Sequence, residues 1–481
     1  MMSLDTSLII AITLVSLLVL LAMQMPVAFA LAGSGALGLL LLHNFGYATN
    51  VLGSVPFSAS ASFTLTMIPM FILMGTLAVK ARVAEHVFAI ANRTSRKLPG
   101  GLGIATVMAC AGFAAVSGST VATAATMSRM AVGEMRKYGY PAHFATGIVA
   151  VAGTLGVMIP PSIMLVLYAV LAGESPAQVM AGGIIPGLLS AAFYIAYIAI
   201  VAKRTIVPAD ATVEAATAEL ASARSSKRGG SVAATGTVTI TAPAQTETRT
   251  VGPVKADSLR HLPWRGLFHI GILFVIVMGG LYSGLVTPTE SAAVGALAAL
   301  AILIIEMRKL GLRQLWSLTV EALKEAAVTT TSVFAIVVGS TVLSTFFVAS
   351  RVPFLLAEWV TSLEVEPWVV VAIFLVILIP MGMALESISI LVIAVPLMHP
   401  IVTGLGFDGI WFAILVVKLI EIGLVTPPVG ISCFVVAGTA GVSPHHVFRG
   451  VLPLILVELL IVVVLFVFPD LITFLPSLVA K

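Results

Sequence analysis

Two similar stretches, GTLGVMIPPS at residues 153–162 and IEIGLVTPPV at residues 420–429, are the most informative part of the sequence. In each, two consecutive prolines follow a glycine within an apolar segment. Proline has no backbone N–H and excludes the preceding residue from the helical region, so carbonyl oxygens one turn earlier lose their hydrogen-bond donors. We expect a broken helix over 142–172 and another over 409–440. A simple kink, with the free carbonyls satisfied by neighbouring helices, is the alternative.

The two stretches belong to an internal repeat. A shift of 267 residues superimposes glycines and prolines of the first half on those of the second, in the same order. The coinciding pairs are Gly156 with Gly423, Pro160 with Pro427, Pro161 with Pro428, Gly183 with Gly450, and Pro186 with Pro453. A single match of this kind carries no information, but a run at constant offset indicates two copies of one structural unit.

The sequence around these stretches is too apolar for a water-soluble protein. Of 481 residues, 59% are hydrophobic and 10% are charged, whereas soluble domains carry about 25% charged residues. A soluble enzyme, a disordered chain and a secreted disulfide scaffold are excluded, which leaves an all-α polytopic membrane protein. The apolar segments predict crossings near 7–24, 27–43, 66–80, 142–172, 180–202, 266–285, 291–308, 329–348, 409–440 and 450–470.

Residues 203–263 interrupt this pattern. They contain no aromatic residue and no methionine, and are rich in alanine, threonine, serine and charge. Such a composition buries too little apolar surface to offset the entropy of ordering, so we expect a disordered linker. It divides the chain into a first repeat, 1–202, and a second repeat, 264–481.

The distribution of charge predicts that the two repeats are inverted. Each repeat has five predicted crossings, an odd number, and basic residues surround 101–131 whereas acidic residues surround 368–399. Because Lys and Arg accumulate on the cytoplasmic side, the first segment should open to the cytoplasm and the second to the opposite side. The linker at 203–263 is basic as well and is expected to be cytoplasmic.

The segments 101–131 and 368–399 are each predicted to form a re-entrant helical hairpin. In AAVSGSTVATAATM, residues 114–127, the turn would lie at 117–119, where glycine permits a tight turn and Ser119 caps the next helix. The second tip would lie in MGMALESIS, residues 381–389. The alternative is a continuous helix whose small residues pack against neighbours. Inverted repeats with interrupted helices are typical of ion-coupled transporters, whose sites form at the interruptions.

Three ionisable residues fall at membrane depth, and each is a functional candidate because an intramembrane charge is costly. Lys418 and Glu421 are three residues apart on one predicted helix, so mutual neutralisation is the simplest interpretation. Glu386 has no partner nearby in sequence; it would ligate Na⁺, relay a proton or lie in water at the hairpin tip. Glu290 follows Pro288 and is interpreted as a helix-start residue.

Other chemistries lack support in the sequence. There is no P-loop, nucleophile elbow or metal-ligand spacing, so we expect a protein that is not an enzyme. The net charge of +4 is small and lies in loops, which favours membrane topology over nucleic-acid binding. Cys110 and Cys433 lie in apolar segments and are interpreted as lipid-buried or packed thiols. No cleavable signal peptide is evident at the N-terminus.

Four motifs, SGSTVATAATM, GTLGVMIPPSI, GLVTPTESAA and EIGLVTPPVG, resemble the large membrane subunit of tripartite ATP-independent periplasmic (TRAP) transporters, the DctM-type permease. The resemblance covers the chain apart from 203–263. It implies a multi-pass subunit in the bacterial cytoplasmic (inner) membrane that works with a small four-helix subunit (DctQ-type) and a periplasmic solute-binding protein (DctP-type). It also implies Na⁺-driven uptake of an organic anion such as a C4-dicarboxylate or sialic acid, by an elevator movement.

The resemblance implies at least two Na⁺ sites, where hairpin tips meet broken helices. Carried over to this sequence, the first site comprises Ser117, Gly118, Ser119, Gly153 and Gly156. The second comprises Gly382, Glu386, Gly423, Thr426 and Pro427. Helix ends and hydroxyl groups at the tips are candidates for holding a carboxylate. The candidate substrate-binding residues are Ser119, Thr120, Glu386 and Ser387.

The chain departs from the family pattern in its long linker at 203–263. No small-subunit helices precede residue 7, which implies a separate partner. Two other functions remain open: a stand-alone ion-coupled dicarboxylate or anion transporter, which would need no partner, and a non-transporting membrane scaffold, which would show no Na⁺ effect.

Overall fold

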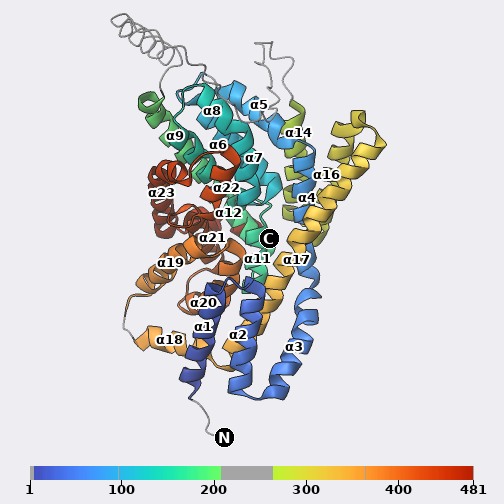
Figure 1. Ribbon diagram of the computed structural model, residues 1–481. Coiled ribbons are helices and arrows are strands. Elements are labelled where there is room, and N and C mark those ends of the chain that lie inside the picture. Colours follow the sequence, from blue (N-terminus) through green and yellow to red (C-terminus); the bar gives the residue numbers. More distant parts are fainter. Residues whose placement is uncertain (1–4, 96, 207–263, 363–364, 480–481) are drawn as a thin grey trace, which may run out of the picture.

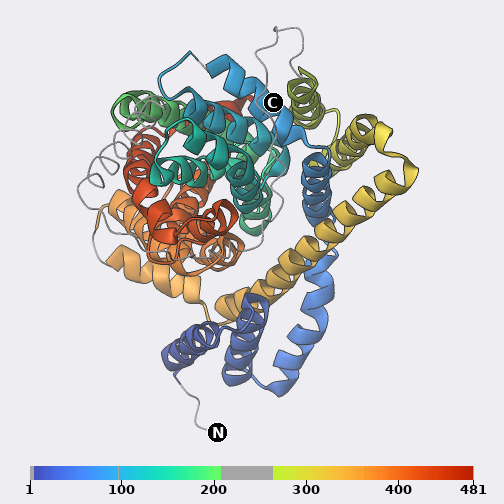
Figure 2. The same cartoon turned by 45° about the horizontal axis from the view of Figure 1, so that its top comes forward.

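The computed structural model describes residues 5–95, 97–206, 264–362 and 365–479, and every regular element in these ranges is a helix. The helices form two groups, shown in Figure 1 and, turned, in Figure 2. One is a compact group that we call the bundle. The other, which we call the arm, extends away from the bundle, and the long helix α17 runs diagonally through it.

The arm contains the first helices of each half of the chain. From the first half these are α1 Thr6–Ala22, α2 Val27–Leu42, α3 Phe45–Ser60, η1 Phe63–Thr66 and α4 Met67–Lys80. From the second half they are α14 Trp264–Phe274, η5 Val275–Gly279, α15 Gly280–Tyr282, α16 Pro288–Met307, η6 Arg308–Leu310 and α17 Leu312–Ala349. The halves interleave, because α2 packs on α17 and α4 packs on α16.

The bundle contains the remaining helices of each half, reached through the connecting helices α5 Val83–Ser95 and α18 Val352–Ser362. Its first-half helices are α6 Gly101–Ser117, α7 Thr120–Met127, η2 Ser128–Val132, α8 Gly133–Lys137, α9 Ala142–Gly153, α10 Leu155–Met158, α11 Ile163–Ala172 and α12 Pro176–Thr205. Its second-half helices are α19 Pro367–Ala384, α20 Ser387–Gly404, α21 Gly409–Val425, α22 Ile431–Ala440, α23 Pro444–Val467 and α24 Asp470–Val479.

The number of long apolar helices agrees with a polytopic membrane protein. Among the described residues, seven helices are long and apolar enough to cross a bilayer, or eight when the pair Ala142–Met158 and Ile163–Ala172, bent by 45°, counts as one span. Two expected crossings, α1 and α2, are shorter, at 17 and 16 residues. The long helix α17 begins at Leu312, well before the expected crossing at 329–348. The linker expected at 203–263 lies outside the described residues from 207 onward.

The two halves are arranged in opposite directions. In Figure 1, α5 and α8, which flank the first hairpin, lie near the top, whereas α18, which precedes the second hairpin, lies near the bottom. The hairpins therefore open toward opposite ends of the molecule. The expected all-α architecture of inverted repeats with two hairpins and two broken helices is confirmed.

Glycines allow helices of different halves to approach closely. A Cβ atom added to Gly450 of α23 would lie 1.8 Å from the carbonyl oxygen of His143 in α9. In the arm, a Cβ on Gly339 of α17 would lie 2.2 Å from the carbonyl oxygen of Ala28 in α2. Membrane helices pack through such small residues because lipid provides no hydrophobic drive for association.

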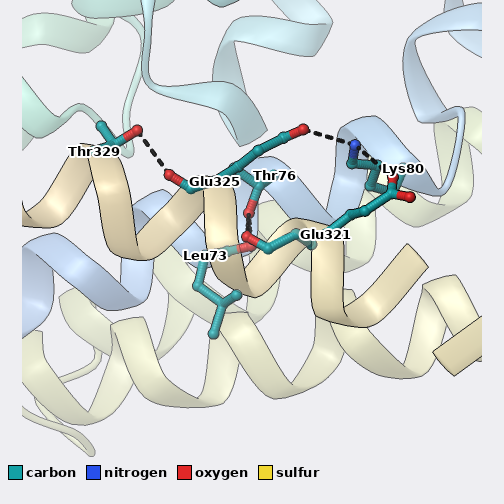
Figure 3. Close-up of polar contacts among 7 residues, drawn as sticks. Leu73, Thr76, Lys80, Glu321, Glu325 and Thr329 are labelled. Carbon is teal, nitrogen blue, oxygen red and sulfur yellow. Dashed lines mark hydrogen bonds and ion pairs between the residues drawn. The ribbon is translucent and has the colours of Figure 1, made fainter. Parts of the chain in front are cut away.

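A polar cluster fixes α17 against α4 within the arm, as Figure 3 shows. The Lys80 Nζ lies 2.7 Å from Glu325 Oε1 and 3.3 Å from Glu321 Oε2. Thr76 Oγ1 donates to the carbonyl oxygens of Leu73, at 3.0 Å, and Ala322, at 3.4 Å. Because both glutamates are about half exposed, these ion pairs orient α17 more than they stabilise it.

Two smaller predictions are confirmed. Glu290 begins α16 in a capping box: its Oε2 accepts from the Thr287 N–H at 2.8 Å, and Thr287 Oγ1 accepts from the Glu290 N–H at 3.3 Å. Both cysteines, Cys110 and Cys433, are buried free thiols.

Candidate functional site

The first hairpin turns where the sequence predicts it. Helix α6 ends at Ser117, Gly118 adopts a φ of +58°, and α7 begins at Thr120. Glycine accepts this left-handed conformation without the strain that a side chain would cause. The Ser119 Oγ accepts the Ala122 N–H at 3.4 Å and so caps α7. A continuous helix, the alternative interpretation, is excluded here.

The tip of this hairpin rests directly on the first broken helix. A Cβ on Gly118 would lie 3.0 Å from the Pro161 carbonyl oxygen, and one on Gly156 would lie 2.9 Å from the Ser119 carbonyl oxygen. The Ser117 and Thr123 hydroxyl oxygens lie 2.8 Å apart beside this contact. Backbone carbonyls and hydroxyls therefore converge at the break, and these oxygen ligands are the type that holds Na⁺ in broken-helix transporters.

The remaining residue of the first predicted set, Gly153, ends α9 and faces the same hairpin. A Cβ at Gly153 would lie 2.9 Å from Ala124 Cβ in α7. All five residues of the first predicted set thus lie along one contact between the hairpin α6–α7 and the broken helix α9–α10.

The second half places its predicted residues differently. Gly382 of α19 and Gly423 of α21 face one another so closely that a Cβ on either would lie within 2.7 Å of the other's Cα. Thr426 ends α21, with its Oγ1 donating to the Ile422 carbonyl at 2.5 Å, and Pro427 begins the break before α22. The two glycines form a helix crossing, and the broken end of α21 follows directly after it.

Glu386 faces the arm. It is exposed, and Ser389 Oγ donates to its Oε2 at 3.4 Å. Glu386 and Ser389 line a cavity of about 690 Å³ whose opposite wall comes from α2 and α17, including Phe29, Thr331 and Ser332. The tip of the second hairpin thus borders a space between bundle and arm.

Glu421 joins the tips of both hairpins. Thr120 Oγ1 donates to its Oε2 at 2.5 Å, and Ser387 Oγ donates to its Oε1 at 3.3 Å. The Glu421 residue is 2% exposed. Thr120 and Ser387, predicted as substrate-binding residues, therefore direct their hydroxyl groups at Glu421.

The predicted mutual neutralisation of Lys418 and Glu421 is wrong. The Lys418 Nζ forms its ion pair with Glu458 Oε2 of α23, at 2.6 Å, and donates to Ser190 Oγ of α12 at 2.7 Å. Lys418 and Glu458 are each 2% exposed. Lys418 pairs with a carboxylate on another helix because the Glu421 carboxyl group already accepts hydrogen bonds from both hairpins. An acid inside an apolar span, as Glu458 is in Pro444–Val467, is the signal in the sequence that points to this buried pair.

The described residues contain no group of three or more His, Cys, Asp or Glu side chains suited to a metal ion.

Comparisons with known proteins agree with this architecture. The C4-dicarboxylate TRAP transporter large permease protein DctM of Pseudomonas aeruginosa is 32% identical over 88% of each chain. The sialic acid TRAP transporter large permease protein SiaM of Vibrio cholerae is 29% identical over 94% of this chain and 95% of that one. The crystal structure of the Alcanivorax borkumensis YdaH transporter shares the fold, with a TM-score of 0.60 at 14% identity over 92% of this chain and 97% of that one.

A family model covers almost the whole of the described structure. It is the model of the tripartite ATP-independent periplasmic transporter, DctM component, and it matches residues 14–471. The match includes both hairpins, both broken helices and Glu421. The chain is therefore a member of the DctM family of large permease subunits of TRAP transporters.

Proposed function

We propose that this chain is the large subunit of a Na⁺-driven importer, which accepts an organic acid from a periplasmic binding protein and moves it across the bacterial inner membrane. The observation that carries the proposal is the direct contact between the first hairpin tip and the first break, at Gly118, Ser119 and Gly156. The relatives named for C4-dicarboxylate and sialic acid transport support a carboxylate as substrate.

Na⁺ would bind at the two interruptions. In the first half the ligands would come from the contact of Ser117, Gly118 and Ser119 with Gly153 and Gly156. In the second half they would come from the segment around Gly423, Thr426 and Pro427, with Gly382 and Glu386 from the hairpin. Na⁺ binding would order these tips and so lower the free energy of the conformation that binds substrate. The Na⁺ gradient would drive uptake in this way.

The substrate would bind between the tips, on the bundle side of the cavity that Glu386 borders. Ser119 is half-buried and its hydroxyl only caps α7, so it is the most available group for a carboxylate. Thr120 and Ser387 donate to Glu421 in this structure, which leaves Ser119 as the hydroxyl donor for the substrate while both tips are closed. In an elevator movement the bundle would carry ion and substrate along the arm.

Two protein partners would work with this chain: a small four-helix membrane subunit of the DctQ type and a periplasmic binding protein of the DctP type. The basic segments around the first hairpin favour a cytoplasmic position for its open end and for loop 203–263.

Uptake in proteoliposomes tests the proposal. With the small subunit reconstituted and the binding protein added, an inward Na⁺ gradient should drive C4-dicarboxylate uptake, with sialic acid as the second substrate to test. Ser119→Ala and Thr426→Ala should each raise the Na⁺ concentration for half-maximal uptake, because each removes an oxygen beside a proposed site. Thr329→Ala is the matched control, because the Thr329 Oγ1 donates to the Glu325 carbonyl within the arm (Figure 3). The Thr426 Oγ1 donates in the same way to the Ile422 carbonyl.

The outcomes separate the three candidate functions. Unchanged Na⁺ dependence in both site variants would argue against the proposed ion sites. Uptake by this chain alone, with neither partner present, would favour a stand-alone anion transporter. No uptake under any condition, together with no Na⁺ effect on the melting temperature, would favour a membrane scaffold.

A further inference from the structure

One carboxyl group connects the two hairpins. Thr120 is the first residue of α7 and Ser387 is the first residue of α20, so each begins the returning helix of its hairpin. Each donates to a different oxygen of Glu421, Thr120 to Oε2 and Ser387 to Oε1. Glu421 itself lies on α21, the first segment of the second broken helix. Three separate elements thus meet at this side chain.

The arrangement departs from the symmetry of the repeat. Thr120 and Ser387 are equivalent positions, since they are 267 residues apart, the offset that relates the two halves. The position equivalent to Glu421 in the first half is Thr154, whose Oγ1 donates to the carbonyl of Val151 on its own helix. Two symmetric hydroxyl groups therefore share one acceptor that has no symmetric copy.

Because the Glu421 carboxyl group is buried, the hydrogen bonds that it accepts from the two hairpin tips depend on each other. A carboxyl group that is 2% exposed requires a hydrogen bond for each oxygen, because leaving a buried acceptor unpaired is costly. If one hairpin tip withdraws, its carboxyl oxygen loses its donor. The Glu421 side chain would then shift to recover a partner, and that shift would disturb its hydrogen bond to the other tip, so the two contacts are coupled.

Neighbouring charged groups do not provide a substitute. Lys418, one turn earlier on α21, is engaged by Glu458 and Ser190. Glu386 points toward the cavity beside the arm, with Ser389 as its donor. Of the contacts around Glu421, the hydroxyls of Thr120 and Ser387 are its hydrogen-bond donors in the described structure.

We propose that Glu421 is a positioning residue that couples the two hairpin tips, so that closure of one tip over its Na⁺ site favours closure of the other. This inference rests on the proposed function, because it assumes that both tips close over bound ions. It assigns to Glu421 no contact with ion or substrate. The coupling requires a hydroxyl group at both Thr120 and Ser387 and an acceptor for both at position 421.

The first experiment measures cooperativity. Na⁺ activation of uptake is recorded in proteoliposomes for the wild type and for Glu421→Leu, Thr120→Val and Ser387→Ala. We expect a Hill coefficient above one in the wild type and a fall toward one in every variant. Half-saturating Na⁺ should rise about fivefold, the lower end of typical couplings between sites. Thr120→Ser and Ser387→Thr retain the hydroxyl group and should keep the wild-type Hill coefficient.

The matched control is Glu290→Gln, which removes a carboxylate that caps a helix of the arm. It should leave the Hill coefficient unchanged. A wild-type Hill coefficient in both Thr120→Val and Ser387→Ala would overturn the inference even if Glu421→Leu fails to fold, because those two variants remove the donors and leave the carboxyl group in place.

A second experiment does not depend on Na⁺. Melting temperatures of the purified protein are compared for Thr120→Val, Ser387→Ala and the double variant, each with Glu421 and with Glu421→Leu. The two substitutions should be non-additive with Glu421 and additive with leucine, because the carboxylate accepts from both hydroxyl groups whereas leucine has no hydrogen-bonding group for either. Additivity in both backgrounds would overturn the coupling. If wild-type uptake is independent of Na⁺, the proposed function fails while this measurement still decides the inference.

Discussion

Replacing Lys418 with alanine is expected to lower the free energy of unfolding by about 3–5 kcal/mol, the usual cost of removing one partner of a buried ion pair. The substitution leaves the Glu458 carboxylate, 2% exposed, without its partner, and leaves Ser190 Oγ without the donor that Lys418 supplies. Three helices of the bundle, α12, α21 and α23, meet at this pair, so the loss should affect the whole bundle. The fall in the melting temperature of the detergent-solubilised variant reports this loss of stability.

Two further variants identify the cause of the loss. Lys418→Met combined with Glu458→Leu removes both charges and keeps most of the volume, so it should recover most of the stability. Lys80→Met removes a lysine whose partners are half exposed and should cost less than about 1 kcal/mol. A double variant no more stable than Lys418→Ala would contradict the assignment of the effect to an unpaired charge.

Gly450→Val should lower the free energy of unfolding by an amount comparable to Lys418→Ala, but for a steric reason. The Cβ would lie 1.8 Å from the His143 carbonyl oxygen, and the facing residue on α9 is Gly147, so neither backbone can yield without separating the helices. Forcing atoms into a close-packed contact typically costs about 1–3 kcal/mol, and we expect a value at or above the upper end because backbone meets backbone. The melting temperature and the yield of monodisperse protein report the loss.

Gly271→Ala is the matched control for this prediction. Gly271 lies within α14, and a Cβ there would meet nothing within 4 Å. Alanine favours a helix over glycine by about 1 kcal/mol, so this variant should be neutral or slightly stabilising. Equal losses at Gly450 and Gly271 would mean that the close approach of α9 and α23 does not matter.

The features that the sequence predicts well are those that local chemistry determines. The turn at Gly118 follows from the conformational freedom of glycine, and the break before Pro160 follows from the missing N–H of proline. The capping box of Glu290 is likewise a pattern within four residues. The repeat offset then transfers each local feature from one half to the other. The positions of the hairpins and broken helices can therefore be predicted from the sequence to within a few residues.

The features that the sequence predicts poorly depend on contacts between distant segments of the chain. Lys418 has its ion-pair partner 40 residues away, and Thr120 meets Glu421 across a separation of 301 residues. Sequence spacing can pair residues on one helix, and it therefore favours Glu421 as the partner of Lys418. It cannot rank partners that only tertiary packing brings together, such as Glu458. The helices α5 and α18 were also missed, since they are shorter than a membrane span.

The connecting helices α5 and α18 are the places where the proposed elevator movement would bend the molecule. In the described parts of the chain each half passes from arm to bundle through one of them, and α18 packs on both α17 and α20. In the proposed elevator movement, displacement of the bundle along the membrane normal would be absorbed near the ends of these two short helices. A nanobody or small molecule that holds α18 against α20 should then inhibit transport noncompetitively, because it would immobilise the hinge without occupying the proposed ion and substrate sites.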